Sequence, residues 1–258
     1  DDGAECNLIR AYNDSTIVSC FNSIYEHGVS MSSNFTAIDY DTLPSTIHRY
    51  FPLPKYYYAT DMEILDSMCY FCGYYNEGTG YDSTAFVGRF SVDELLRQGD
   101  TCSVELVRIP DYLCFSKISA SHVMDNKELV FLALIGVNYA FEEATKSRGY
   151  ATSLVMMGNY NMNYNVDSWH YNSLTPVSEY NLYFKDVLTS YDKIYASATY
   201  NGRNDTVSVV TVDAFSLNHT GLTGLLSNLV LSSGDVFHVS SPIVICQDPL
   251  GIYNIQLF

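Results

Sequence analysis

The residues best suited to contact a ligand are concentrated in one segment, residues 159–174. Aromatic side chains alternate there with amides, and a histidine follows the single tryptophan of the chain. Tyrosine and tryptophan rings offer apolar area with a polar group at the edge, so they suit a sugar ring or a peptide partner. A loop or edge strand that packs its rings on its own sheet has the same pattern. The candidate ligand-binding residues are Tyr160, Tyr164, Trp169, His170 and Tyr171.

The spacing of Cys69 and Cys72 is that of a redox motif or of half a zinc site. Redox use requires a helix N-terminus, which lowers the pKa of the thiol, but these residues lie in an apolar, strand-like run. Residues three apart in a strand point to opposite faces, so we expect two buried core cysteines instead. With seven cysteines at least one thiol is free, and pairing of Cys102 with Cys114 across a hairpin stays open.

The sequence contains no other pattern typical of catalysis. The six histidines form neither a His-x-His nor a His-Glu-x-x-His pattern, and neither Gly-x-Ser-x-Gly nor a phosphate-binding loop occurs. We therefore predict no catalytic residues, no metal and no cofactor, although a zinc site assembled from distant residues stays open. Paired carboxylates are the remaining enzymatic option, because glycosidases place two acidic groups roughly 5–10 Å apart. The 29 acidic residues show no pattern that selects such a pair.

The charge balance and the length of the apolar runs argue against two kinds of partner, nucleic acid and the membrane interior. The chain has 13 basic and 29 acidic residues and a net charge of −16. Such a surface repels phosphate backbones, so nucleic acid is not an expected partner. The longest apolar run, residues 129–137, is far shorter than the roughly 20 residues of a membrane span, and we expect no membrane insertion. The acidic residues are scattered, as on a surface that keeps a protein soluble.

The first residues, Asp1-Asp2-Gly3, are not a secretion signal, because no apolar stretch follows a basic start. The alternatives are a cytosolic protein and a mature chain whose export signal has been removed. Abundant Tyr, Ser, Asn and Thr with little Lys favour the second, so we expect an extracytoplasmic location: secreted, periplasmic or cell-surface. The oligomeric state stays open.

Short runs of β-branched and aromatic residues recur along the chain, each after a turn that contains an aspartate. These aspartates are Asp14, Asp66, Asp125 and Asp192, spaced 52, 59 and 67 residues apart. Each unit has room for three or four strands, including residues 62–65 ahead of their turn, and a shorter fifth unit ends the chain. The aromatic stretch 50–58 is expected to connect two units. Residues 93–98 fit one helical turn, and residues 220–231 fit a short helix or a loop.

A unit of this size cannot bury both faces of its sheet alone, so neighbouring units have to stack. Radial stacking into a propeller also limits exposed sheet edges. We therefore predict an all-β, β-propeller-like fold of about five irregular blades, with residues 1–258 as a single domain. The alternative is a two-sheet β-sandwich, which predicts evenly spaced single strands instead of paired strands in each unit.

One unit resembles a known group of proteins. The run Cys69-Tyr70-Phe71-Cys72-Gly73, a loop, and residues 85–92 are similar to a blade of uncharacterised secreted β-propeller-like proteins of gut Bacteroidetes. The similarity covers about 25 residues closely and the rest of the chain only as a pattern. It implies an exported protein, and it transfers no functional residue to this chain.

Two functions from different classes fit these observations. The first is an extracytoplasmic binding module for a glycan or a protein, without catalytic machinery, since propeller loops gather on one face as a recognition surface. The second is a carbohydrate-active hydrolase that uses paired carboxylates. Enzymatic activity is left open, with the binding module preferred.

Overall fold

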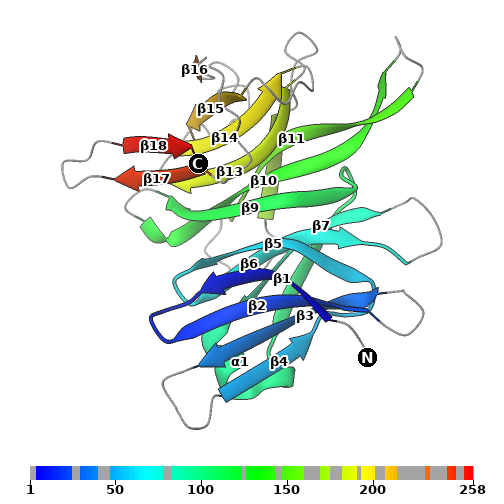
Figure 1. Ribbon diagram of the computed structural model, residues 1–258, viewed down its shortest axis with the longest axis vertical. Helices are drawn as coiled ribbons and strands as arrows, with labels where there is room; N and C mark the ends of the chain where they lie inside the picture. The colour runs from blue at the N-terminus through cyan, green and yellow to red at the C-terminus, as the bar shows by residue number, and fades with distance from the viewer. Residues whose placement is uncertain are drawn as a thin grey trace. The chain divides into compact units, whose positions relative to one another are not determined.

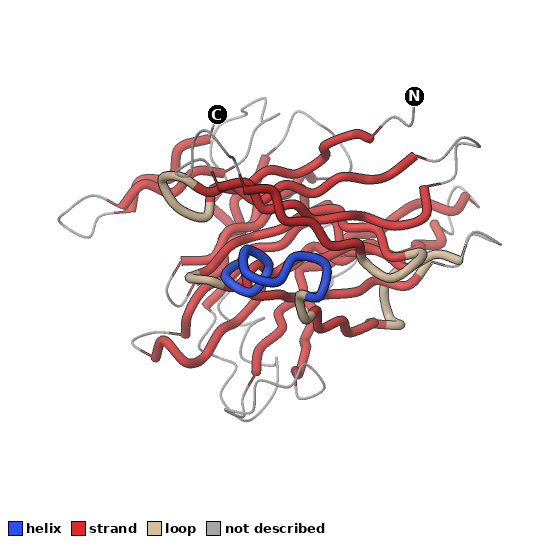
Figure 2. Tube along the Cα trace, turned by 90° about the horizontal axis from the view of Figure 1, so that it is seen from below, coloured by secondary structure: helices blue, strands red, loops and turns tan. Residues whose placement is uncertain are grey.

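The computed structural model describes the chain in thirteen segments and consists mostly of β-strands (Figure 2). The described residues are 4–24, 30–39, 47–77, 83–123, 126–142, 147–159, 169–174, 182–190, 193–200, 207–213, 230–232, 243–247 and 253–257. Nearly every strand pairs antiparallel with the strand before or after it in the chain, as the short connections predict. The expectation of an all-β fold is therefore confirmed.

Two four-stranded sheets form the first part of the chain (Figure 1). The first sheet contains β1 (Ala4–Ala11), β2 (Thr16–Ile24), β3 (Ser30–Asp39) and β4 (Ile47–Pro52) in that order. The second contains β5 (Tyr57–Leu65), β6 (Met68–Tyr75), β7 (Thr84–Ser91) and β8 (Val104–Ile109), also in order. Residues 53–56 connect β4 to β5, so the aromatic stretch 50–58 links two units as expected.

Three further sheets follow in the described residues. The third has the order β12-β11-β10-β9, from β9 (Cys114–Val123), β10 (Asn126–Glu142), β11 (Ser147–Asn159) and β12 (Trp169–Leu174). The fourth contains β13 (Leu182–Ser190), β14 (Lys193–Tyr200), β15 (Val207–Asp213) and β16 (Val230–Ser232). The last pairs β17 (Ile243–Gln247) with β18 (Tyr253–Leu257). The described residues thus form four four-stranded sheets and one two-stranded sheet. That each sheet is one blade stays a prediction.

The first strand of a unit lies ahead of its turn aspartate, as expected for residues 62–65 ahead of Asp66. Asp14 and Asp66 lie in the turns that follow the first strands, β1 and β5, and not ahead of the units. Asp66 has a positive φ of 53°, a conformation that aspartate tolerates better than most residues because its side chain bonds locally. The aspartates therefore mark the first hairpin of a unit. Asp125 and Asp192 lie outside the described residues.

A repeated irregularity supports the equivalence of the units. In β1, β5 and β13 the pairing with the next strand shifts at the fourth residue: Asn7, Thr60 and Lys185. Such a β-bulge bends its strand and re-aims the side chains that follow. In the second and fourth units the next residue is an aspartate, Asp61 and Asp186.

A seven-residue helix joins the last two strands of the second sheet. Helix α1 (Val92–Gln98) begins where the Ser91 hydroxyl accepts a hydrogen bond from the Glu94 amide. It is followed by η1 (Gly99–Thr101) and lies against β4, where Arg49 donates to the Leu96 carbonyl. The predicted helical turn at residues 93–98 is confirmed, whereas most of residues 220–231 lie outside the described residues. Among the described residues, no helix has the length and apolar character to cross a membrane.

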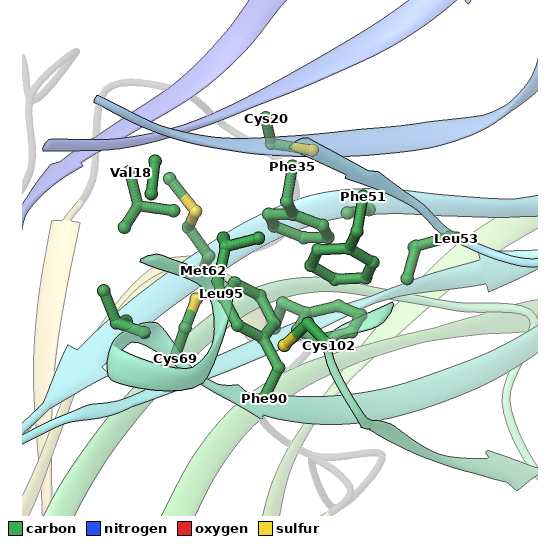
Figure 3. Packing of buried hydrophobic residues seen from close by; sticks show 14 of the residues in the cluster. Val18, Cys20, Phe35, Phe51, Leu53, Met62, Cys69, Phe90, Leu95 and Cys102 are labelled. Atoms are coloured by element: carbon green, nitrogen blue, oxygen red, sulfur yellow. The ribbon is translucent and has the colours of Figure 1, made fainter. Parts of the chain in front are cut away.

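Phenylalanines form the core between the first and second sheets (Figure 3). Phe35, Phe51 and Phe90 pack with ring centroids 4.9–5.5 Å apart, and their side chains are almost completely buried. Gly88 admits the ring of Phe71, because a Cβ there would lie 2.4 Å from the ring. Gly88 therefore has a packing role.

The chain divides into two compact units. The first consists of the first two sheets with the following residues to 120 and 136–138, and the second contains most of the later strands. The expectation of a single domain over residues 1–258 stays a prediction.

Candidate functional site

The predicted binding segment is described only in part. Trp169, His170 and Tyr171 lie on β12, where their backbones pair with residues 159, 158 and 157 of β11. Tyr160 and Tyr164 lie outside the described residues. The strand thus brings three of the five candidates onto one edge of the third sheet, and their role as ligand contacts stays a prediction.

A second group of aromatic and charged side chains lies at one end of the second sheet. We call it the tyrosine–arginine cluster, and it consists of Lys55, Tyr56, Tyr57, Tyr75, Glu77 and Arg108. The start of β5, the end of β6 and the end of β8 position these residues. Tyr57 on β5 pairs with Tyr75 on β6, and Arg108 on β8 pairs with Phe86 on β7.

The guanidinium of Arg108 is the centre of this cluster. It lies 3.5 Å from the ring centroid of Tyr75 and 5.2 Å from that of Tyr57. Its Nε donates a hydrogen bond of 2.7 Å to the Tyr57 hydroxyl. The Tyr75 hydroxyl bonds to the carboxylate of Glu77, and this hydrogen bond raises the pKa of Tyr75. A positive charge is therefore held on two ring faces at an exposed end of the sheet.

The rings of the cluster continue the core to the surface. Tyr57 contacts buried Phe86 edge-on at 5.0 Å and Tyr75 at 4.9 Å. Tyr56 contacts Tyr75 at 6.4 Å, and the Lys55 ammonium lies 4.7 Å above the ring of Tyr56. The inner rings are thus fixed by packing, while Lys55 and Arg108 are exposed.

The backbone at Tyr56 is strained. The Tyr57 amide donates to the Pro54 carbonyl in a β-turn, and Tyr56, third in that turn, has φ of +74°. Glycine normally occupies such a position, and other residues there cost of order 1–3 kcal/mol. Strain of this kind is concentrated at functional sites. An aromatic residue occupies this position although glycine would fit the backbone better.

Charged residues from the first strands of three sheets form a second group, the polar cluster, which consists of Arg10, Asp61, Glu63 and Lys117. Arg10 on β1 donates to Asp61 Oδ1 at 2.9 Å, and the Ile118 amide on β9 donates to Oδ2 at 3.2 Å. The Asp61 side chain is 5% exposed and that of Arg10 37%. Asp61 therefore joins three strands at the start of their sheets.

The two carboxyls of the polar cluster lie in different electrostatic environments. Burial raises the pKa of Asp61, and Lys117, the Ile118 amide and Arg10 oppose that shift. Burial also raises the pKa of Glu63 to about 7, against the opposing charge of Arg10 and with the carboxylate of Asp61 adding to the rise. Glu63 can hold or release a proton near neutral pH, whereas both oxygens of Asp61 are already engaged.

A structural role for Asp61 is supported by its counterpart in the fourth sheet. Asp186 also follows the bulge of a first strand, and its Oδ1 accepts a hydrogen bond from the next amide, Val187, at 3.0 Å. The carboxyl of Asp61 is likewise hydrogen-bonded by the amide of Met62. A recurring aspartate that binds the amide after a bulge maintains the bend of the strand.

The paired cysteine motif lies on both faces of its strand, as its spacing predicted. Cys69 is part of the core between the first two sheets (Figure 3), whereas Cys72 contacts Thr60 and the Phe115 carbonyl on the other face. Six cysteines are described with free thiols: Cys6, Cys20, Cys69, Cys72, Cys102 and Cys114. Cys102 and Cys114 are therefore unpaired with each other here.

Comparisons with known proteins identify a fold and no family. No protein-family model matches the sequence, and no curated protein matches it. Among solved structures, cobalt-substituted apocarotenoid oxygenase (ACO) of Synechocystis matches with a TM-score of 0.53 and 14% identity. That match covers 96% of this chain and 53% of the oxygenase. An ACO/RPE65 chimera matches with a TM-score of 0.52 and 13% identity, covering 95% and 52%.

These structures are β-propellers, so the likeness supports a propeller-like fold for this chain. The chain spans about half the length of the oxygenase structures it matches. Within the part of the chain that the structure describes, no group of three or more His, Cys, Asp or Glu side chains is placed to hold a metal ion. We therefore derive no chemistry through a metal such as the cobalt of that structure.

Proposed function

We propose that this chain is an extracytoplasmic binding module whose ligand, a glycan, packs on the tyrosine–arginine cluster. The observation that carries the proposal is Arg108 held over Tyr57 and Tyr75 beside the strained Tyr56. Tyrosine rings offer flat faces to the C–H groups of a sugar, and the guanidinium offers several hydrogen-bond donors. Residues 169–171 form a second proposed contact surface, which the alternation of aromatic residues and amides in residues 159–174 supports.

The proposed architecture is a propeller of about five irregular blades, each of the five sheets being one blade. The repeated bulges in the first strands and the likeness to propeller structures support it. In such an arrangement ligands contact the loops and strand ends of the blades, which is where the tyrosine–arginine cluster lies in its own sheet.

A carbohydrate-active hydrolase is the second candidate. It is favoured by one observation, the Glu63 carboxyl whose pKa is raised to about 7 beside a second carboxyl at Asp61. A general acid needs such a pKa. Its partner is less suitable, since Arg10 and the Ile118 amide occupy both oxygens of Asp61.

A glycan array separates these functions. We expect the wild-type protein to bind a subset of glycans, Arg108→Met and Tyr75→Ala to lose that binding, and Tyr139→Ala, an exposed tyrosine outside the cluster, to retain it. Trp169→Ala tests the second surface. Turnover of a glycoside panel that is lost in Glu63→Gln would replace the binding module with the hydrolase. Array binding unchanged in both cluster variants would contradict the proposed site.

A further inference from the structure

Two thiols from different sheets converge on a single carbonyl group. Cys72 on β6 lies with its Sγ 3.7 Å from the carbonyl oxygen of Phe115, and the Sγ of Cys114 on β9 lies 3.1 Å from the same oxygen. Thr60 is shared as well: its hydroxyl lies 3.7 Å from the Cys72 Sγ and is hydrogen-bonded to Cys114. Common partners place the two sulfurs close to each other.

The Phe115 carbonyl has more donors around it than it can accept. The Thr60 hydroxyl donates to it, and both thiols are also within reach of it. A carbonyl oxygen has two lone pairs, and a thiol is a weak donor. Removal of both S–H groups would leave the carbonyl with the hydroxyl of Thr60, its strongest donor. In the reduced state one of these three donors therefore finds no lone pair on this carbonyl.

We propose that Cys72 and Cys114 are a disulfide-forming pair that links the second sheet to the first strand of the third. The oxidant is a small-molecule or protein disulfide. One cysteine thiolate attacks a sulfur of the oxidant and expels a thiolate; the second cysteine then attacks the resulting mixed disulfide at the protein sulfur and expels the other. The two cysteines lose two protons and two electrons, and the oxidant is reduced to two thiols.

The burial of the two thiols indicates when the bond forms. Cys72 is completely buried and Cys114 is half-buried. Burial raises the pKa of Cys114 to about 12 and that of Cys72 well above its usual range. Since the thiolate is the attacking species, the folded reduced protein reacts slowly. The bond therefore forms during folding in an oxidising compartment, before the sheets exclude the oxidant.

Peptide mapping tests the pairing. The whole chain is refolded with oxidised and reduced glutathione, free thiols are alkylated, and tryptic peptides are analysed without reduction. Trypsin places Cys72 in peptide 56–89 and Cys114 in peptide 109–117. We expect these two peptides to be linked. Because Cys69 is also in the first peptide, Cys69→Ser is the matched control: it retains the link, whereas Cys72→Ser loses it.

Thermal unfolding of the wild type, with and without a reductant, gives a second readout that needs no variant. A disulfide between Cys72 and Cys114 closes a loop of the chain and is expected to raise the Tm of the wild type by roughly 5–10 °C. A reductant abolishes this increase. Cys114→Ser, at the half-buried position, removes the response to the reductant, and Cys102→Ser retains it. Alkylated Cys72 and Cys114 in the refolded protein, or a link from Cys69 to any other cysteine, would overturn the proposal.

Discussion

The tyrosine–arginine cluster and the polar cluster share strand β5 but surround their charged groups differently. In the polar cluster, Arg10 and the Ile118 amide are directed at the carboxylate of Asp61, which is almost completely buried. In the tyrosine–arginine cluster, the guanidinium of Arg108 lies on the faces of two rings and is exposed.

Water explains the difference between these clusters. A charge removed from water has to be paired, so the buried cluster contributes to folding and has little capacity left for a ligand. An exposed guanidinium over aromatic rings costs little to keep and still has donors to offer. The comparison predicts that substitutions in the polar cluster change stability and that those in the tyrosine–arginine cluster change binding.

The largest effect is expected from Arg10→Met. The substitution removes the ion-pair partner of the buried Asp61 carboxylate and leaves it the Ile118 amide and the charge of Lys117. Breaking such a pair costs about 3–5 kcal/mol when it is fully buried. Because the Arg10 side chain is 37% exposed, we expect a loss of about 3 kcal/mol in the free energy of unfolding by urea. Arg97→Met, at the exposed end of α1, is the control. A similar loss in the free energy of unfolding in both variants would show that the buried pair contributes no more to stability than an exposed arginine.

A pH-dependent effect is expected from Glu63→Gln. The pKa of Glu63 is raised to about 7 in the folded protein, so the folded state binds the proton more tightly than the unfolded state. The stability of the wild type therefore falls as the pH rises from 4.5, the ordinary pKa of a glutamate, to about 7. Glutamine does not ionise, so the stability of the variant lacks this pH dependence. With a discount for partial exposure, the variant is expected to be about 2 kcal/mol more stable at pH 8 and equal at pH 4.

Denaturation at a series of pH values measures this difference. Parallel pH profiles for the wild type and Glu63→Gln would show that Glu63 is solvated as an ordinary surface carboxyl. A difference with the opposite sign would mean that the ionised form is the one the fold stabilises.

A change in binding with little change in stability is expected from Arg108→Met. An exposed cation–π contact contributes about 0.5–1 kcal/mol, so the free energy of unfolding should fall by no more than that. Affinity for a glycan found on the array should fall at least about tenfold, equivalent to about 1.4 kcal/mol. Calorimetric titration against Arg97→Met checks it, and a stability loss with unchanged affinity would assign Arg108 to the fold.

The smallest effect is expected from Tyr56→Gly. Glycine adopts the positive φ of this turn without strain, so stability should rise by up to about 1 kcal/mol, while the loss of the ring weakens glycan binding. Urea unfolding and the same titration measure both. A variant that is less stable would show that Tyr56 is retained for packing.

The sequence predicted the units and a helical turn because those features are local. Strand runs and turn aspartates repeat along the chain, and residues 93–98 carry their own capping serine at Ser91. The turn aspartates mark the first hairpin of a unit and not its start. A strand ahead of the turn was expected at residues 62–65, whereas β1 ahead of Asp14 was not recognised. The opposite orientation of Cys69 and Cys72 followed from the two-residue period of a strand.

Neither cluster was predicted, because each assembles from distant parts of the chain. The stretch 50–58 was recognised as aromatic and interpreted as a connection, but its partners Tyr75 and Arg108 come from other strands with no local motif. Asp61 and Glu63 are two of many acidic residues, and only the fold places Arg10 beside them.

Calorimetric titration of the Tyr75→Ala variant with the strongest glycan from the array tests the central claim most directly, since Tyr75 contacts Tyr56, Tyr57 and Arg108. The account predicts at least about a tenfold loss of affinity, with a Tm close to that of the wild type and unchanged affinity in Tyr139→Ala. Equal affinity in the wild type and Tyr75→Ala would contradict it.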